Sequence, residues 1–176
     1  MLKLVLLSTG HKEQKPSAAH WASGYATYAY SMGFAAQNYS DYQLDNGISR
    51  LDVARFAAKA LGYGASNTTS PFADVNDGYV TALYEAGVFI GTKVGDLTYF
   101  YPNSSITRAE VATIYFRMLT DESRTKFWSQ SNAYSDVKAG DWFNNAVSTL
   151  SNAGIIAGYE DGSFRPNGYI TRAEFA

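Results

Sequence analysis

Apolar residues recur along this chain at intervals of three and four positions, separated by stretches rich in glycine, aspartate and tyrosine. Such intervals place apolar side chains on one face of an α-helix. They predict first helices at residues 21–33, 78–86 and 142–152, and we expect Gly87 and Gly154 to end the last two as left-handed glycines. The apolar positions are Tyr25, Tyr28 and Met32, then Val80, Leu83 and Tyr84, then Ala146, Val147 and Leu150.

A second set of helices is predicted to begin at the pentapeptide ITRAE, residues 106–110 and 170–174, and at its looser copy ISRLD, residues 48–52. A hydroxyl residue followed three positions later by an acid forms a capping box, and the preceding isoleucine packs on the fourth helical residue. Helix initiation therefore explains the isoleucine, the hydroxyl and the acid. It does not explain the arginine, because the helix dipole disfavours a cation in the first turn by about 0.3–1 kcal/mol.

The last of these helices is expected to be short, since it begins after Thr171 and the sequence ends at Ala176. A single isolated turn is unstable in water. We therefore expect the third unit to be truncated and its C-terminus to fray, unless a neighbouring chain or the N-terminal segment covers it.

These features belong to an internal repeat. Arg50, Arg108 and Arg172 recur at intervals of about 60 residues, and other landmarks keep the same order. FADV at 72–75 returns as YSDV at 134–137. The remaining pairs are GVFIG at 87–91 with GIIAG at 154–158, and FYPN at 100–103 with FRPN at 164–167.

The third unit, from YSDV to ITRAEFA, resembles the S-layer homology (SLH) domain family at about ten ordered positions. The second unit is similar, with Tyr79 where the family usually has tryptophan and an insertion-like loop at 93–98. The first is similar through His20-Trp21-Ala22 and ISRLD. The implied divisions are an N-terminal extension at 1–16, a divergent repeat at 17–66, a second repeat at 67–128 and a truncated third repeat at 129–176.

The resemblance implies an all-α fold in which tandem repeats adopt a pseudo-threefold helical arrangement, with a central helix bundle and peripheral prong helices. It also implies non-covalent anchoring to pyruvylated secondary cell-wall polysaccharide, through grooves between repeats that use the TRAE arginine. That role carries over to Arg108 and Arg172, and to Arg50 in the looser copy. Arginine suits the task because its planar fork holds a carboxylate through two parallel hydrogen bonds.

Five further residues are predicted to contact the ligand. Gly91 and Gly158 would allow a sugar to approach the backbone closely, and Tyr101, Tyr159 and Trp142 would stack on sugar rings.

Each of these roles has a structural alternative. For Arg108 the alternative is a solvated ion pair, with Glu110 for example, and Trp21 and Trp142 fit packing positions at helix starts. Asp74 and Asp136 are expected to cap the turns that follow them.

Composition narrows the function. The chain has 46% hydrophobic residues, which favours a folded domain. A net charge of -2 excludes a basic nucleic-acid surface, and the absence of cysteine excludes disulfides and thiolate chemistry.

MLKLVLL at 1–7 is too short for an export signal, and no run reaches the length of a membrane span. His11 and His20 lack ligand-spaced partners, so we expect no metal site. We also expect no cofactor and no catalytic site.

We therefore expect this protein to be an extracellular binding module of the bacterial cell wall or S-layer, and not an enzyme. The alternative is a protein–protein or self-assembly scaffold of a cell-surface layer, since an open apolar groove beside the short last helix would invite self-association.

Overall fold

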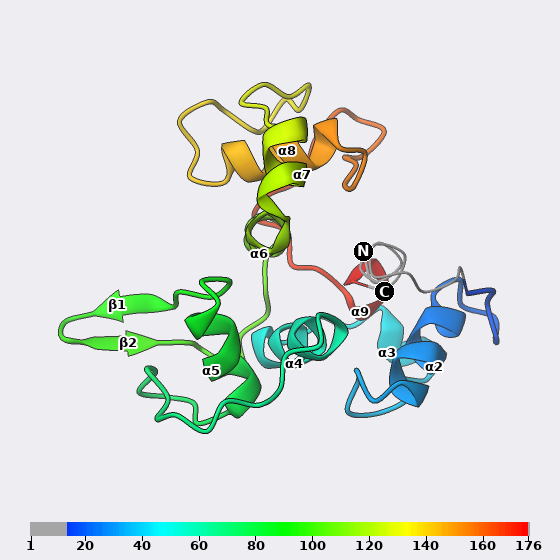
Figure 1. Ribbon diagram of the computed structural model, residues 1–176. Coiled ribbons are helices and arrows are strands. Elements are labelled where there is room, and N and C mark those ends of the chain that lie inside the picture. The colour runs from blue at the N-terminus through cyan, green and yellow to red at the C-terminus, as the bar shows by residue number, and fades with distance from the viewer. Residues whose placement is uncertain (1–13, 176) are drawn as a thin grey trace. The chain divides into compact units, whose positions relative to one another are not determined.

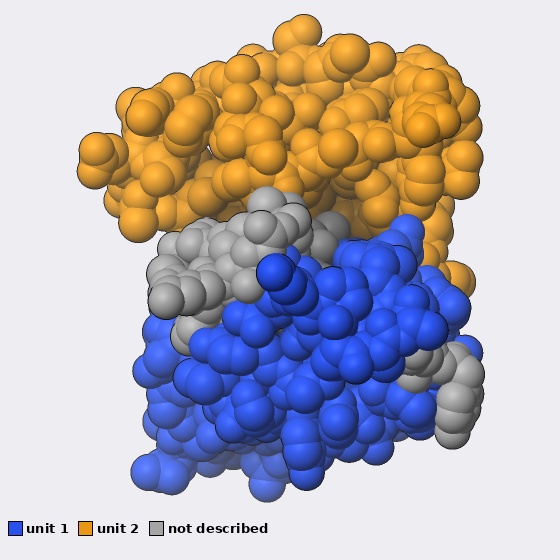
Figure 2. All heavy atoms as spheres, turned by 90° about the vertical axis from the view of Figure 1, so that its right-hand side faces the viewer, with its two compact units in different colours: residues 1–105, 170–176 blue, residues 106–169 orange. Residues whose placement is uncertain are grey.

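A computed structural model describes residues 14–175, and the chain divides into two units (Figure 2). The first unit comprises residues 1–105 together with 170–176, and the second comprises residues 106–169. The predicted helical class is confirmed, since the described elements are helices apart from a two-stranded sheet. The pseudo-threefold arrangement and the repeat boundaries stay predictions, and residues 1–7 lie outside the described part of the chain.

The first unit is built from short helices that pack in pairs (Figure 1). Helix α4 (Arg50–Ala60) packs against α5 (Gly78–Glu85), and α3 (Asp41–Leu44) contacts α9 (Arg172–Phe175). Helix α2 (Ser23–Ser31) precedes them in the chain. The largest fully buried side chains of this unit are Leu44, Val53, Val80, Leu83, Phe100 and Ile170.

The second unit holds α6 (Arg108–Met118), α7 (Asp121–Phe127) and α8 (Asn144–Asn152), with α6 and α7 both packed on α8. Beside the apolar core, Asn132 donates to the side chains of Asn144 and Ser148, both at 3.0 Å. These bonds hold the loop that precedes α8 against the helix, because a buried polar group is stable only when it is paired.

The predicted first helices are confirmed as α2, α5 and α8, and their ends follow glycine chemistry. At Gly154 (φ 68°), the glycine N–H donates to Ser151 and the Ile155 N–H donates to Leu150, both at 2.9 Å. This pair of bonds is the Schellman motif, which needs a left-handed residue. The same arrangement ends helices at Gly33, Gly62 and Gly87.

The predicted helix starts form as well. In each, a hydroxyl accepts the N–H of the residue three positions on; the pairs are Ser49 and Asp52, Thr107 and Glu110, and Thr171 and Glu174. The two glutamates return the bond to the N–H of Thr107 at 2.8 Å and of Thr171 at 2.9 Å. Ile106 and Val111 are fully buried, as a hydrophobic staple requires.

The insertion-like loop at 93–98 is not irregular. Strands β1 (Thr92–Val94) and β2 (Leu97–Tyr99) pair antiparallel, with Val94 opposite Leu97. The Gly95-Asp96 turn has glycine in the left-handed region (φ 59°), which suits a two-residue hairpin.

The last helix is formed over its described residues, Arg172–Phe175, and fraying at the C-terminus stays a prediction. Phe175 is buried, and its ring meets the ring of Phe56 edge-on at 5.4 Å. The short helix is therefore stabilised by packing on α4, because tertiary burial compensates for a length at which isolated helices are unstable.

Replacing Asp77 tests the capping of α5. Its carboxylate accepts the N–H groups of Tyr79 and Val80 and pairs with Arg55 at 2.8 Å. We expect Asp77→Ala to lower the free energy of unfolding by about 1–2 kcal/mol, measured by chemical denaturation. Asp96→Ala, at an exposed turn of the same unit, is the control. Equal stability of the two variants would contradict the capping role.

Candidate functional site

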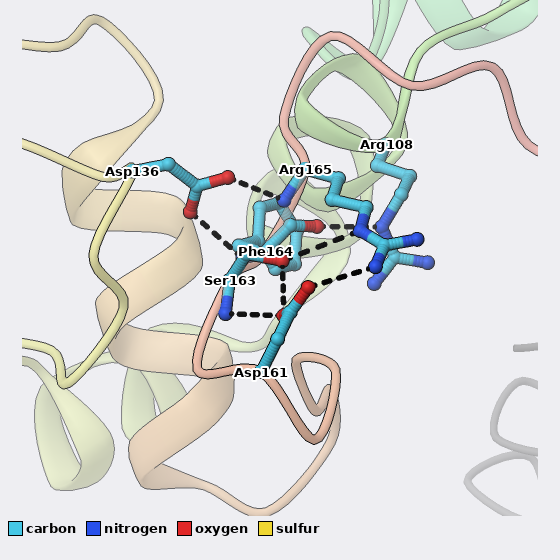
Figure 3. A network of polar contacts seen from close by, with 6 residues as sticks. All are labelled: Arg108, Asp136, Asp161, Ser163, Phe164 and Arg165. Atoms are coloured by element: carbon cyan, nitrogen blue, oxygen red, sulfur yellow. Dashed lines mark hydrogen bonds and ion pairs between the residues drawn. The ribbon is translucent and has the colours of Figure 1, made fainter.

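A carboxylate shapes the loop that precedes the last pentapeptide. Asp136 accepts the backbone N–H groups of Phe164 and Arg165, each at 2.8 Å (Figure 3). Arg165 has a positive φ of 57°, a conformation that costs energy for a residue with a side chain and that the two bonds help to maintain. The expected capping of the following turn by Asp136 is wrong, because its carboxylate reaches across 28 residues of chain.

The first unit repeats this arrangement. Asp74 accepts the N–H groups of Phe100 at 2.8 Å and Tyr101 at 2.7 Å, and Tyr101 has a φ of 59°. The expected role of Asp74 is therefore wrong in the same way. We call the aspartate, the phenylalanine and the left-handed residue that follows it the loop frame.

The loop frame turns a carbonyl toward Arg108 and, in the first unit, toward Arg50. Arg108 donates from Nε to the Phe164 carbonyl at 2.8 Å and from Nη2 to Ala157 at 3.2 Å. Its guanidinium carbon lies 4.9 Å from the ring centroids of both Tyr159 and Phe164. Arg108 is only 9% exposed, so it does not lie in the solvated surface position that the ion-pair alternative assumed.

Arg50 makes the corresponding contacts in the first unit. Its Nε donates to the Phe100 carbonyl at 2.8 Å, and its guanidinium lies 5.3 Å from the Phe100 ring and 5.9 Å from that of Phe89. The cation in the first helical turn is therefore stabilised by carbonyl dipoles and ring faces, which offset the unfavourable helix dipole.

Arg172 also contacts a carbonyl and an aromatic ring, but both belong to a different loop. It donates from Nη1 to the Gln43 carbonyl at 3.1 Å and lies 4.6 Å from the Tyr39 ring, while its Nε is buried without a hydrogen-bond partner. A pocket of about 40 Å³ adjoins it, with Asp52 in its otherwise largely apolar wall.

Packing inside the protein explains why glycine stands at the two positions predicted to lie close to the ligand. A Cβ on Gly158 would collide with the Tyr134 ring and the Ser163 carbonyl, and one on Gly91 (φ 67°) would collide with the Phe72 ring. Sugar contact at these glycines stays a prediction.

The predicted aromatic platforms are accessible to different extents. Trp142 is 67% exposed, Tyr101 is 41% exposed and Tyr159 is half-buried. Trp21 is also 54% exposed, and the rings of Trp21 and Trp142 contact those of His20 and Phe143, so the alternative of packing at helix starts stays open.

Sequence reasoning missed an exposed arginine beside Arg108. Arg165 lies with its guanidinium carbon 3.8 Å from the Tyr159 ring centroid and pairs with Asp161 at 2.8 Å (Figure 3). Asp161 also accepts the N–H and hydroxyl of Ser163. The Ser163 bonds, with that from Arg165, hold the pKa of Asp161 well below its usual range. The matching position, Tyr101, was the available signal, since FRPN aligns with FYPN.

Other chemistry is not supported within residues 14–175. No group of three or more histidine or acidic side chains there is placed to hold a metal ion. Among the same residues, every helix is too short or too polar to cross a membrane.

Comparison with known proteins agrees with the repeat landmarks. The profile of the family described as S-layer homology domain matches residues 69–112 and 133–176. "Cell surface glycoprotein 1" of Acetivibrio thermocellus is 32% identical over 93% of this chain, and the "Cellulosome-anchoring protein" of that organism is 33% identical over 76%. "Amylopullulanase" of Thermoanaerobacterium thermosulfurigenes is 37% identical over 64%.

The matches cover small parts of these relatives, 7%, 31% and 6% of their lengths respectively. The profile and the surface-protein relatives confirm the predicted cell-surface location.

Arg165→Gln tests the cause of the Asp161 pKa shift. Loss of the guanidinium should raise the pKa of Asp161 part of the way to its ordinary value, leaving the Ser163 bonds in place. A depressed pKa stabilises the fold above the unfolded-state pKa and loses that effect as pH falls, so the variant loop should gain less stability from Asp161 at neutral pH and lose less of it on acidification. Carboxyl NMR titration measures the change, and an unaltered midpoint would contradict it.

Proposed function

The chain belongs to the S-layer homology domain family, and from this premise we propose that it binds pyruvylated secondary cell-wall polysaccharide as the non-covalent anchor of a surface protein. The binding surface is formed where two of the pentapeptide arginines meet a loop frame of another repeat and where the third meets the loop at Gln43. The arginines are Arg50, Arg108 and Arg172, with Tyr101, Tyr159 and Trp142 as stacking platforms and Gly91 and Gly158 at close backbone contacts.

The repeated loop frame is the observation that supports this proposal. In both units it brings together a helix N-terminus, an arginine held by a carbonyl and an aromatic ring. A ketal-linked pyruvate offers a carboxylate beside a sugar ring. Guanidinium groups suit the carboxylate, and tyrosine faces suit the ring.

Anchoring requires no catalytic group in these repeats. The match to an amylopullulanase covers 6% of that protein, so we place any catalysis outside the matched region. The role proposed here is to hold an attached domain at the wall, whichever activity that domain has.

A scaffold function is the alternative, and the hairpin favours it. Val94 and Leu97 face each other across β1 and β2, and each is 52% exposed. An exposed cross-strand apolar pair suits a protein contact. Concentration-dependent oligomers in light scattering, without polymer binding, would support this alternative.

Arg108→Ala tests the proposed site. The loop should lose the donor that holds the Phe164 carbonyl, so we expect roughly tenfold or weaker binding in sedimentation with purified pyruvylated wall polymer. Lys126→Ala removes one positive charge from exposed α7 and should bind like the parent chain.

Circular dichroism and thermal unfolding identify any global loss of structure in Arg108→Ala. A folded variant with undiminished binding would rule out this site. Failure of the parent chain to bind the polymer would rule out the proposed function itself.

A further inference from the structure

We propose that Arg165 is the residue that contacts the ligand carboxylate beside α6, and that Arg108 is a positioning residue there. This inference rests on the proposed function and refines it. It assigns contact with the ligand carboxylate to a loop position that differs between repeats, in place of the arginine of the repeated pentapeptide.

Arg108 is poorly placed to meet a ligand. It is 9% exposed, its Nε and Nη2 donate to the carbonyls of Phe164 and Ala157, and its guanidinium lies against two rings. A carboxylate would have to displace these carbonyls or enter a closed site. The contacts instead suit a residue that holds the loop in place.

Arg165 presents the accessible cation. Its side chain is 53% exposed, and it lines an open depression together with Gly158, Tyr159, Glu160 and Asp161. The Tyr159 ring supports the guanidinium from one side at 3.8 Å. A guanidinium held in this way loses little conformational freedom when it binds a planar anion.

Asp161 shows that this guanidinium accepts a carboxylate in its present position. One Asp161 oxygen is fixed by Ser163, and the other accepts from Arg165 Nη2 at 2.8 Å. The ion pair is half-exposed on both sides, and such pairs change an equilibrium by roughly fivefold at most. A ligand carboxylate therefore competes with Asp161 on favourable terms.

The first unit supplies an internal comparison. Tyr101 has the same left-handed backbone and the same aspartate support as Arg165, but its ring stacks on Tyr99 at 5.7 Å and 19°. One loop frame therefore presents a cation and the other an aromatic face. We infer that the Arg165 loop selects an acidic sugar residue and that the Tyr101 loop selects a neutral one.

The test is calorimetry of the whole chain with a short pyruvylated disaccharide and with its methyl ester, which lacks the charge. Arg165→Gln should bind the acid up to about fivefold more weakly and the ester almost unchanged. Arg108→Gln should weaken both alike, as expected for a positioning residue. Lys126→Gln, in the same unit, is the charge-matched control.

Asp161→Asn keeps the acceptor for Ser163 and removes the competing charge. It should tighten binding of the acid by up to about fivefold and leave the ester unaffected. Equal binding of the acid by Arg165→Gln and the parent chain would overturn the inference while leaving the proposed function intact. An equal loss for acid and ester in Arg165→Gln would also overturn it, since Arg165 would then be structural.

Discussion

The contact on which the repeats depend joins an arginine in the first turn of a helix to a carbonyl in a loop of another repeat. It occurs in both units, from Arg50 to Phe100 and from Arg108 to Phe164, each at 2.8 Å. A short helix cannot hold a distant loop by its own propensity. The charged donor supplies the connection, and the aspartate of the loop frame keeps the accepting carbonyl turned toward it.

This arrangement separates stability from recognition. The aspartate, the phenylalanine carbonyl and the helix arginine form the constant part, and their bonds are satisfied inside the protein. The left-handed residue is the variable part, because its side chain projects from a backbone that is already fixed. Arg165 and Tyr101 show that one frame can carry unlike chemistry.

Local features were predictable because their causes lie within a few residues. Capping boxes at Thr107 and Thr171 involve partners three positions away, and the helix end at Gly154 needs one left-handed glycine. The hairpin at 92–99 escaped prediction because a short insertion carries little alternation. The packing of Phe175 escaped it because Phe56 is far away in the sequence.

The sequence alone determined the repeat, the family, and where most helices begin and end, since those features depend on residue order and short-range hydrogen bonds. Only the tertiary structure decided what the arginines and aspartates do. Arg108 meets its carbonyl 56 residues away and Asp136 meets its N–H partner 28 residues away. Spacing predicts that such groups matter, but only the folded chain shows which arginine is buried against a carbonyl and which is exposed.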